Sequence, residues 1–154
     1  MSVEAVKNEL KTYGLADRVM EFEVSSATVE LAAIALGTHP ERIAKSLTFY
    51  GKENDCLMIV TAGDQKIDNA KFKAFFGCKA KMMSPEDALA FTGHAVGGVC
   101  PFALLQNGSV KVYLDESMRR FDTVYPAAGS SNSAAKMNCD ELFVASHALA
   151  WIDV

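Results

Sequence analysis

The sequence contains no long hydrophobic run, and none approaches the ~20 apolar residues that a membrane-spanning helix needs. Its N-terminal stretch, MSVEAVKNELKTYG, is amphipathic and carries both signs of charge. It lacks the basic start and the apolar centre of a signal peptide. These absences argue against a membrane protein and against a secreted one. We therefore expect a cytoplasmic protein with no membrane partner.

Cysteine is scarce and dispersed along the chain. The 4 cysteines form no CxxC motif, and no histidine stands near one at the spacing of zinc ligands. Disulfides are not expected in a reducing compartment, so each thiol is expected to act as a small buried apolar group. The sequence thus predicts no metal site and no cofactor. The cysteines are Cys56, Cys78, Cys100 and Cys139.

Positive charge is also in deficit, because the formal net charge is −4 and the isoelectric point is about 5.3. This balance argues against bulk binding of a phosphate backbone, and so against DNA, but not against a partner held at one end. A local basic stretch remains open to two interpretations: a partner contact, or a solvated face balanced by Asp64 and Asp68. Its members are Lys66, Lys71, Lys73, Lys79 and Lys81.

The 154 residues suffice for a single domain, 1–154, with a sizeable core, and no repeat or linker interrupts them. Apolar spacing and helix-ending glycines predict helices at residues 3–13, 28–36, 68–76, 85–92 and 140–147, with a short one from Glu116. Alternating and β-rich segments predict strands at 19–24, 44–50, 56–61, 102–105 and 110–114, with extended chain at 124–128.

These elements do not follow a strict βαβ repeat. Residues 44–50 and 56–61 are joined across GKEND as a hairpin, and the helices fall irregularly between the strands. The pattern predicts an α+β fold with a mixed, partly barrel-like β-sheet flanked by helices.

The stretch TGHAVGGVCPFAL, from Thr92, places Gly97, Gly98 and Pro101 inside an apolar run where the chain is expected to bend into the sheet. Bare glycine backbone permits close approach of a ligand and leaves peptide groups free to face it. The proline fixes the direction in which the chain leaves. A β-bulge or turn without any ligand explains the same residues.

Lys45 is a charged residue on an apolar strand face. Strand alternation places it on the same side as Ile43, Leu47 and Phe49. A lysine there is costly unless its ammonium finds a partner, so it indicates either a pocket for an anionic or carbonyl ligand or a side chain that reaches water.

Three segments, IAKSL, GHAVGGVCPF and YPAAGSS, occur in an order that resembles the YbaK/prolyl-tRNA-synthetase-associated domain family. The resemblance covers most of the chain, from Phe22 to the last helix. It implies a mixed, partly closed sheet and an aminoacyl-tRNA deacylase that hydrolyses the ester of a mischarged amino acid on the 3′ end of tRNA. The tRNA acceptor end is the implied partner. Whether an aminoacyl-tRNA synthetase is a second partner stays open, as do the amino acid removed and the tRNA preferred.

The resemblance also implies site residues. The family lysine matches Lys45, which we expect at the terminal phosphate or ribose, and the backbone of Gly97 and Gly98 is expected at the amino acid and the attacking group. No Ser-His-Asp order supplies a protein nucleophile. In family members that remove cysteine, the thiol of the substrate itself attacks the ester. The expected substrate-binding residues are Ser46, His94, Val99, Cys100, Pro101, Asp115, Gly129 and Ser130.

Several of these positions carry an alternative. Cys100 stands where serine or another small residue is expected and is a weak candidate nucleophile, since no histidine lies at a motif distance. His94 either orients water or the ribose, or serves a plain capping or surface role. Asp115 either caps a helix or joins the site. After Gly129 the sequence reads SSN, without the basic residue of the cysteine-specific branch.

Three functions remain compatible with the sequence: a deacylase, a non-catalytic module that binds tRNA ends or a nucleotide, and a small-molecule or protein-interaction module that kept the fold. Fold alone does not choose among them. Loss of the aminoacyl group selects the first, a mobility shift without that loss selects the second, and no tRNA binding selects the third.

Overall fold

The computed structural model describes residues 3–105 and 109–154. Five α-helices are formed by α1 (Val3–Leu10), α2 (Val29–Leu36), α3 (Asn69–Phe76), α4 (Pro85–Thr92) and α5 (Cys139–Ala145). The strands are β1 (Val19–Glu21), β2 (Ile43–Tyr50), β3 (Cys56–Ala62), β4 (Val110–Asp115), β5 (Tyr125–Pro126), β6 (Ser133–Ala135) and β7 (Trp151–Ile152). Short 3₁₀ helices occupy residues 11–13, 16–18, 40–42 and 116–120.

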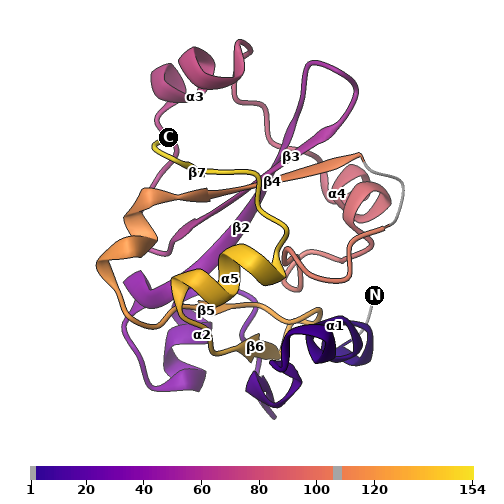
Figure 1. Ribbon diagram of the computed structural model, residues 1–154, viewed down its shortest axis with the longest axis vertical. Helices are drawn as coiled ribbons and strands as arrows, with labels where there is room; N and C mark the ends of the chain where they lie inside the picture. Colours follow the sequence, from indigo (N-terminus) through magenta and orange to yellow (C-terminus); the bar gives the residue numbers. More distant parts are fainter. Residues whose placement is uncertain (1–2, 106–108) are drawn as a thin grey trace.

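The main sheet has five strands in the order β5-β2-β3-β4-β7 (Figure 1). The β2–β3 hairpin is antiparallel, and the other three pairings are parallel. A two-stranded sheet, β1 with β6, lies beside it and is linked to it by a bridge between Ala127 and Ala134. This arrangement confirms the predicted α+β fold with a mixed sheet flanked by helices.

Local sequence signals explain where the helices begin and end. Ser84 caps α4, with its side chain accepting a hydrogen bond from the Asp87 amide and Pro85 at the first helical position. Thr28 caps α2 in the same way, and Gly37 ends that helix at a φ of 68°, a conformation that costs glycine little. The predicted helix boundaries are therefore confirmed to within a few residues.

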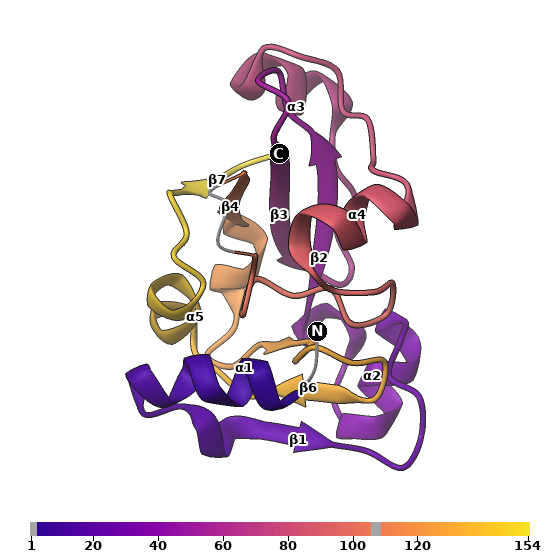
Figure 2. The same cartoon turned by 90° about the vertical axis from the view of Figure 1, so that its right-hand side faces the viewer.

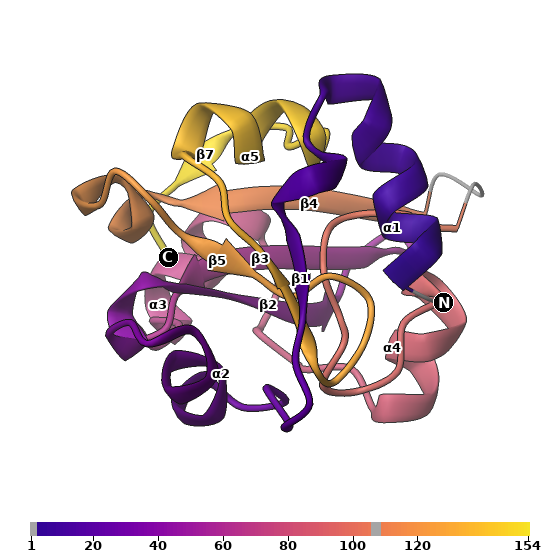
Figure 3. The same cartoon turned by 90° about the horizontal axis from the view of Figure 1, so that it is seen from below.

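Both faces of the sheet are covered, and every residue of β3 is therefore buried. Met58 and Val60 belong to the main core cluster, beneath α1 and α5. Leu57 and Ile59 point the other way, into a second cluster that includes Phe72 of α3. Figure 3 shows α1 and α5 beside β4, with α2 and α4 beyond β2 at the opposite edge of the sheet.

Two predictions about strands are corrected. Residues 102–105 form no strand but a bend and an irregular segment, in which Phe102 is fully buried against the core. The strand predicted over 19–24 ends at Glu21. The short strands β6 and β7 were not expected. Within the described ranges, no helix is both long enough and apolar enough to cross a membrane.

Candidate functional site

A cavity of about 440 Å³ lies between β2, the start of α2, the start of α4 and the loop that follows α4. This volume falls within the range of small-molecule sites, and its lining is mainly apolar with a few polar groups, as such sites require. Residues 26–29 form one wall, Met83 and Ala88 form another, and Val96, Gly97 and Val99 close it from the loop. Further lining residues come from the chain around β5 and β6: Tyr125, Ala127, Ser133 and Ala134.

The floor of the cavity is an open edge of β2. Strand β5 pairs with β2 at Ile43 and Ala44 and goes no further. Farther along the same edge, the Thr48 carbonyl accepts a hydrogen bond from the Met83 amide. Peptide groups alternate in direction along a strand, so the N–H and C=O of Ser46 point to this edge as well. The described part of the chain supplies no strand partner for Ser46 there. The cavity therefore meets an open peptide edge.

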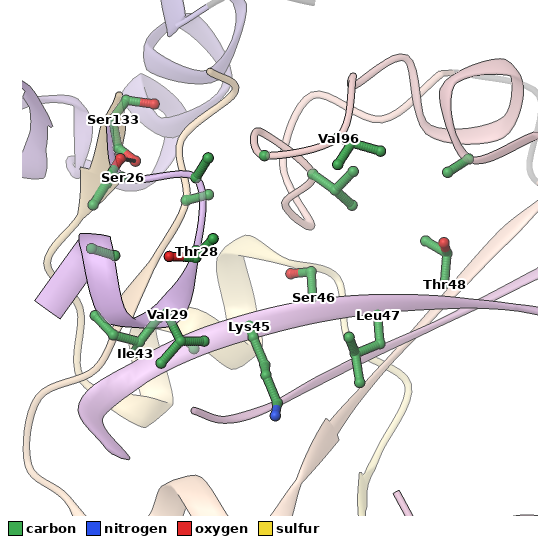
Figure 4. A pocket seen from close by; sticks show the side chains of 18 of the residues that line it. Ser26, Thr28, Val29, Ile43, Lys45, Ser46, Leu47, Thr48, Val96 and Ser133 are labelled. Atoms are coloured by element: carbon green, nitrogen blue, oxygen red, sulfur yellow. Dashed lines mark hydrogen bonds between the residues drawn. The ribbon is translucent and has the colours of Figure 1, made fainter. Parts of the chain in front are cut away.

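The side chain of Ser46 adds an unusual polar group to this floor. Its Oγ atom is buried, and no hydrogen-bond partner for it is found among the residues described. Figure 4 shows the Ser46 and Thr48 side chains on the side of β2 that faces the Val96 loop. A buried hydroxyl without a partner has lost its hydrogen bonds to water and is therefore destabilising, unless a ligand supplies the missing hydrogen bond.

Lys45, which we expected at the terminal phosphate or ribose of a bound tRNA end, does not point at the glycine loop. Its backbone borders the cavity, but its side chain extends from the opposite face of β2, with Leu47 (Figure 4). There Nζ donates hydrogen bonds to the carbonyl oxygens of Gly63, at 3.4 Å, and of Gln65. Burial lowers the pKa of this ammonium, and the negative charges of Asp64 and Glu30 oppose that effect.

The two loop glycines are explained by contacts between protein segments. A β-carbon on Gly98 would lie 2.8 Å from the Ser130 backbone nitrogen, which is closer than real contacts allow. Gly97 has a φ of 92°, and a β-carbon there would lie 3.1 Å from the β-carbon of Ala27. Gly97 lines the cavity, whereas the buried Gly98 fits against the neighbouring loop. The space that we expected a ligand to need at Gly98 is occupied by protein backbone.

His94 and Cys100 meet beneath the loop rather than in the cavity. Both are fully buried, and Sγ of Cys100 lies 3.6 Å from Nε2 of His94. Nε2 also lies 2.6 Å from the carbonyl oxygen of Phe102, so this nitrogen carries the proton and donates it. Burial lowers the pKa of His94 and raises the pKa of the Cys100 thiol to about 12. Both groups are neutral near pH 7, which favours an anchor for the loop over a thiolate nucleophile.

The other predicted residues divide between the cavity and its support. Val99 lines the cavity, as do Ser46 and Gly97, and Pro101 is buried behind the loop. Gly129 is buried and has a φ of 97°. It precedes Ser130, whose hydroxyl donates to either the Asn132 side chain or the Ser133 hydroxyl, each 2.8 Å away.

Asp115 lies outside the cavity lining and has a structural role. Its carboxylate accepts hydrogen bonds from the Ser117 amide, the Thr61 hydroxyl and the Val154 amide. It thereby caps the 3₁₀ helix at 116–120 and fixes the C-terminal residue to the end of β4. Of the two alternatives for Asp115, these contacts support the cap.

The sequence interpretation missed several polar residues of the cavity. Ser26 and Thr28 come from the serine- and threonine-rich segment before α2, and Ser133 comes from the second such segment, SSNS. The Ser26 amide donates to the Ser131 carbonyl at 2.7 Å, so the two segments are joined. The feature of the sequence that could have indicated these residues is the pair of short serine-rich segments.

The cavity is poor in ionisable groups. Among the described residues that line it, Lys45 is the one charged residue, and its side chain lies on the opposite face of β2, while Tyr125 is the other residue that can titrate. The lining thus offers peptide groups, hydroxyls and apolar surface rather than an acid–base pair. Such a site can position a polar, uncharged bond and the donors that stabilise charge developing on it.

Comparison with known proteins matches residues 23–143 to the aminoacyl-tRNA editing domain. The Bacillus subtilis (strain 168) protein YwhH, described as uncharacterized, is 49% identical over 154 residues, which are 100% of this chain and 97% of that protein. A proline–tRNA ligase of Thermotoga sp. (strain RQ2) is 33% identical over 93 residues, 60% of this chain but 15% of the ligase.

Solved structures agree with the family match. A crystal structure presented as a candidate trans-editing enzyme for prolyl tRNA synthetase has a TM-score of 0.85 and 28% identity, covering 97% of this chain and 96% of that one. The crystal structure of protein APE2540 has a TM-score of 0.85 and 25% identity, covering 96% of this chain and 97% of that one.

Proposed function

Because the chain belongs to the aminoacyl-tRNA editing domain family, we propose that it is a deacylase that hydrolyses the ester between a mischarged amino acid and the 3′ end of tRNA. The observation that carries the proposal is the cavity itself, in which the open edge of β2 presents an unpartnered, buried Ser46 hydroxyl. A buried polar group without a partner marks a place where a ligand supplies one.

Hydrolysis of an aminoacyl ester, which is already activated, requires few catalytic groups from the protein. An attacking oxygen or sulfur forms a bond to the ester carbonyl carbon, and the carbonyl oxygen becomes an oxyanion. Collapse of this tetrahedral intermediate breaks the bond to the ribose oxygen, which takes up the proton released by the attacking group. Hydrogen-bond donors held rigidly around the developing oxyanion stabilise it. We assign this role to the peptide N–H and hydroxyl of Ser46 and to the backbone at Gly97.

We assign the attacking group to water or to the substrate. The cavity lining contains no histidine, cysteine or carboxylate among the described residues, and Cys100 is buried behind it with a raised pKa. A cysteinyl ester carries its own thiol, which can attack the carbonyl within the bound substrate. An alanyl ester has no such group and needs a bound water.

The size and lining of the cavity favour a small, uncharged amino acid. Met83, Ala88, Val96 and Val99 provide apolar contacts and no counter-charge for an acidic or basic side chain. Because one relative is a proline–tRNA ligase and one structural neighbour is named as a candidate trans-editing enzyme for prolyl tRNA synthetase, we propose tRNA specific for proline, mischarged with alanine or cysteine. That synthetase is then the proposed protein partner.

Lys45 is proposed to bind the terminal phosphate or ribose. It is the one charged residue among the described residues whose backbone borders the cavity, and β2 is open beside it, so the flexible side chain can reach around the edge. To do so, its ammonium exchanges the carbonyl oxygens of Gly63 and Gln65 for the substrate. The burial that lowers its pKa already disfavours an unsatisfied charge at this site.

A deacylation panel tests the proposal. The pure protein is mixed with tRNA charged in turn with alanine, cysteine, serine, threonine or proline, and the remaining ester is measured over time. We expect faster loss of alanine or cysteine than in buffer, and no loss of proline. A mobility shift with uncharged tRNA but no accelerated ester loss would instead favour a non-catalytic module that binds tRNA ends.

A further inference from the structure

More than half of the exposed lysines without a carboxylate partner in this acidic protein lie in one region. Every arginine, together with Lys7, Lys71 and Lys111, has a carboxylate within ion-pairing distance. Seven exposed lysines have no such partner among the described residues, and four of the seven gather around α3. We call these the basic surface: Lys52, Lys73, Lys79 and Lys81.

Contacts join these lysines across three segments of the chain. Lys73 of α3 and Lys79 line the same shallow hollow. Lys52, in the β2–β3 turn, places its Nζ beside Gly77 at the end of α3. The ammonium of Lys81 lies 5.4 Å from the centre of the Tyr50 ring, next to that turn. The four charges therefore lie on neighbouring segments of the surface.

The acidic residues expected to balance this region are occupied elsewhere. Asp64 pairs with Arg120 at 2.7 Å, and Asp68 accepts a hydrogen bond from the Lys71 amide as the cap of α3. In the β2–β3 turn, Glu53 and Asp55 both pair with Lys111. The four lysines thus have no salt-bridge partner among the described residues, and their like charges repel one another on neighbouring segments.

The basic surface leads directly to the cavity. Met82 and Met83 follow Lys81 in the chain, and both line the cavity, while Met82 is 58% exposed. Figure 2 shows the connection between α3 and α4 running from α3 along the side of the molecule to α4. This segment therefore gives a polyanion whose end enters the cavity a route across these lysines.

We infer that the basic surface binds the phosphates of the tRNA acceptor end while the terminal aminoacyl-adenosine occupies the cavity. The inference rests on the proposed function for the identity of the partner. Lysines act on phosphates as point charges, so they hold the strand without reading its sequence. Four such contacts give this chain a phosphate-binding face despite its net charge of −4.

A matched pair of double variants tests the inference. Lys73→Ala/Lys79→Ala removes two charges from the basic surface. Lys11→Ala/Lys136→Ala removes two other exposed lysines, without carboxylate partners in the described chain, from the region of α1 and β6 at the far end of the molecule (Figure 2). Binding of uncharged tRNA is measured by fluorescence anisotropy at several salt concentrations. Thermal melts confirm that both variants are folded.

We expect the first variant to bind tRNA about tenfold more weakly than the control, with the slope of log K against log salt reduced by about 1.5. Equal affinities and equal slopes for the two variants would overturn the inference, as would no measurable binding of tRNA by the wild type. A separate assay uses the wild type and an aminoacyl-adenosine ester, which lacks the upstream phosphates. If that ester is not hydrolysed while the tRNA result holds, the deacylase proposal fails and the basic surface stands.

Discussion

Gly98 and Ser130 pack backbone against backbone, and the space for a β-carbon on Gly98 is filled by the amide nitrogen and Cα of Ser130. This contact joins the loop after α4 to the turn before β6, and both segments continue into the lining of the cavity. Gly98 therefore fixes the distance between two walls of the cavity, although it does not itself line the cavity.

Gly98→Ala is expected to destabilise the protein by about 1–3 kcal/mol, because the added methyl group overpacks a contact between two backbones. Gly14→Ala is the comparison for backbone strain without overpacking, since Gly14 has a φ of 70°, which alanine resists, and nothing lies within 4 Å of its missing β-carbon. Chemical denaturation of both variants gives the free energies of unfolding. A Gly98→Ala protein as stable as the wild type would show that the two loops separate at little cost.

Ser46→Ala separates function from stability. The Ser46 hydroxyl has no partner in the described structure, so its removal is expected to leave the melting temperature unchanged or to raise it. The rate of ester hydrolysis is expected to fall at least tenfold, which corresponds to about 1.4 kcal/mol. Ser133→Ala is the comparison, because that hydroxyl accepts a hydrogen bond from the Ser130 amide and its loss should reduce stability. Wild-type activity in Ser46→Ala would remove this hydroxyl from the mechanism.

Cys100 is expected to support the loop rather than react. Cys100→Ser should keep substantial activity, because the serine hydroxyl can still donate to the Phe102 carbonyl as the thiol does. If this variant is folded but inactive, and a thiol reagent labels Cys100 selectively in the wild type, the cysteine is the nucleophile after all.

The same thiol makes stability depend on pH. Burial raises its pKa from the ordinary 9.0 to about 12 in the folded protein. Above pH 9 the unfolded state therefore binds fewer protons, so the stabilising effect is full below pH 9 and is lost as the pH rises toward 12. We expect the free energy of unfolding to fall more steeply in the wild type than in Cys100→Ser, by up to about 1.4 kcal/mol per pH unit. Parallel curves would show that the thiol ionises equally in both states.

Lys45→Ala is expected to fold and to lose most deacylation, because it removes the ammonium that we propose binds the terminal phosphate or ribose beside the cavity. Some loss of stability is expected as well, since Nζ holds the Gly63 and Gln65 carbonyl groups. Lys66→Ala is the control, because Lys66 is an exposed neighbour whose charge acts on Lys45. Circular dichroism and initial rates measure the two effects. Equal activity in the two folded variants would leave Lys45 with a structural role alone.

Sequence patterns predicted those features that depend on near neighbours. The alternation of β2 correctly placed Lys45 with Leu47 and Phe49, and the cap at Ser84 correctly marked the start of α4. The strands β6 and β7 are 3 and 2 residues long, so their pairing depends on the tertiary fold and leaves no alternating pattern.

The arrangement of the site was less predictable. Alternation fixes that Lys45 and Ser46 lie on opposite faces, but not which face the loop after α4 will cover. In the same way, His94 and Cys100 are six residues apart in the sequence. Their side chains meet because the loop folds back and brings the Phe102 carbonyl oxygen to Nε2 of His94. The open edge at Ser46 depends on where β5 ends, which no local signal in β2 reports.

The central claim is that the cavity on the open edge of β2 hydrolyses a mischarged aminoacyl ester. The most direct measurement is release of labelled amino acid from alanyl-, cysteinyl- and prolyl-tRNA, with tRNA specific for proline in excess over the wild-type protein. The account predicts multiple turnovers on the alanyl or cysteinyl ester, at least tenfold faster than in buffer, while the prolyl ester persists. If all three esters decay at the buffer rate in the presence of protein that is shown to bind the tRNA, the result contradicts the account.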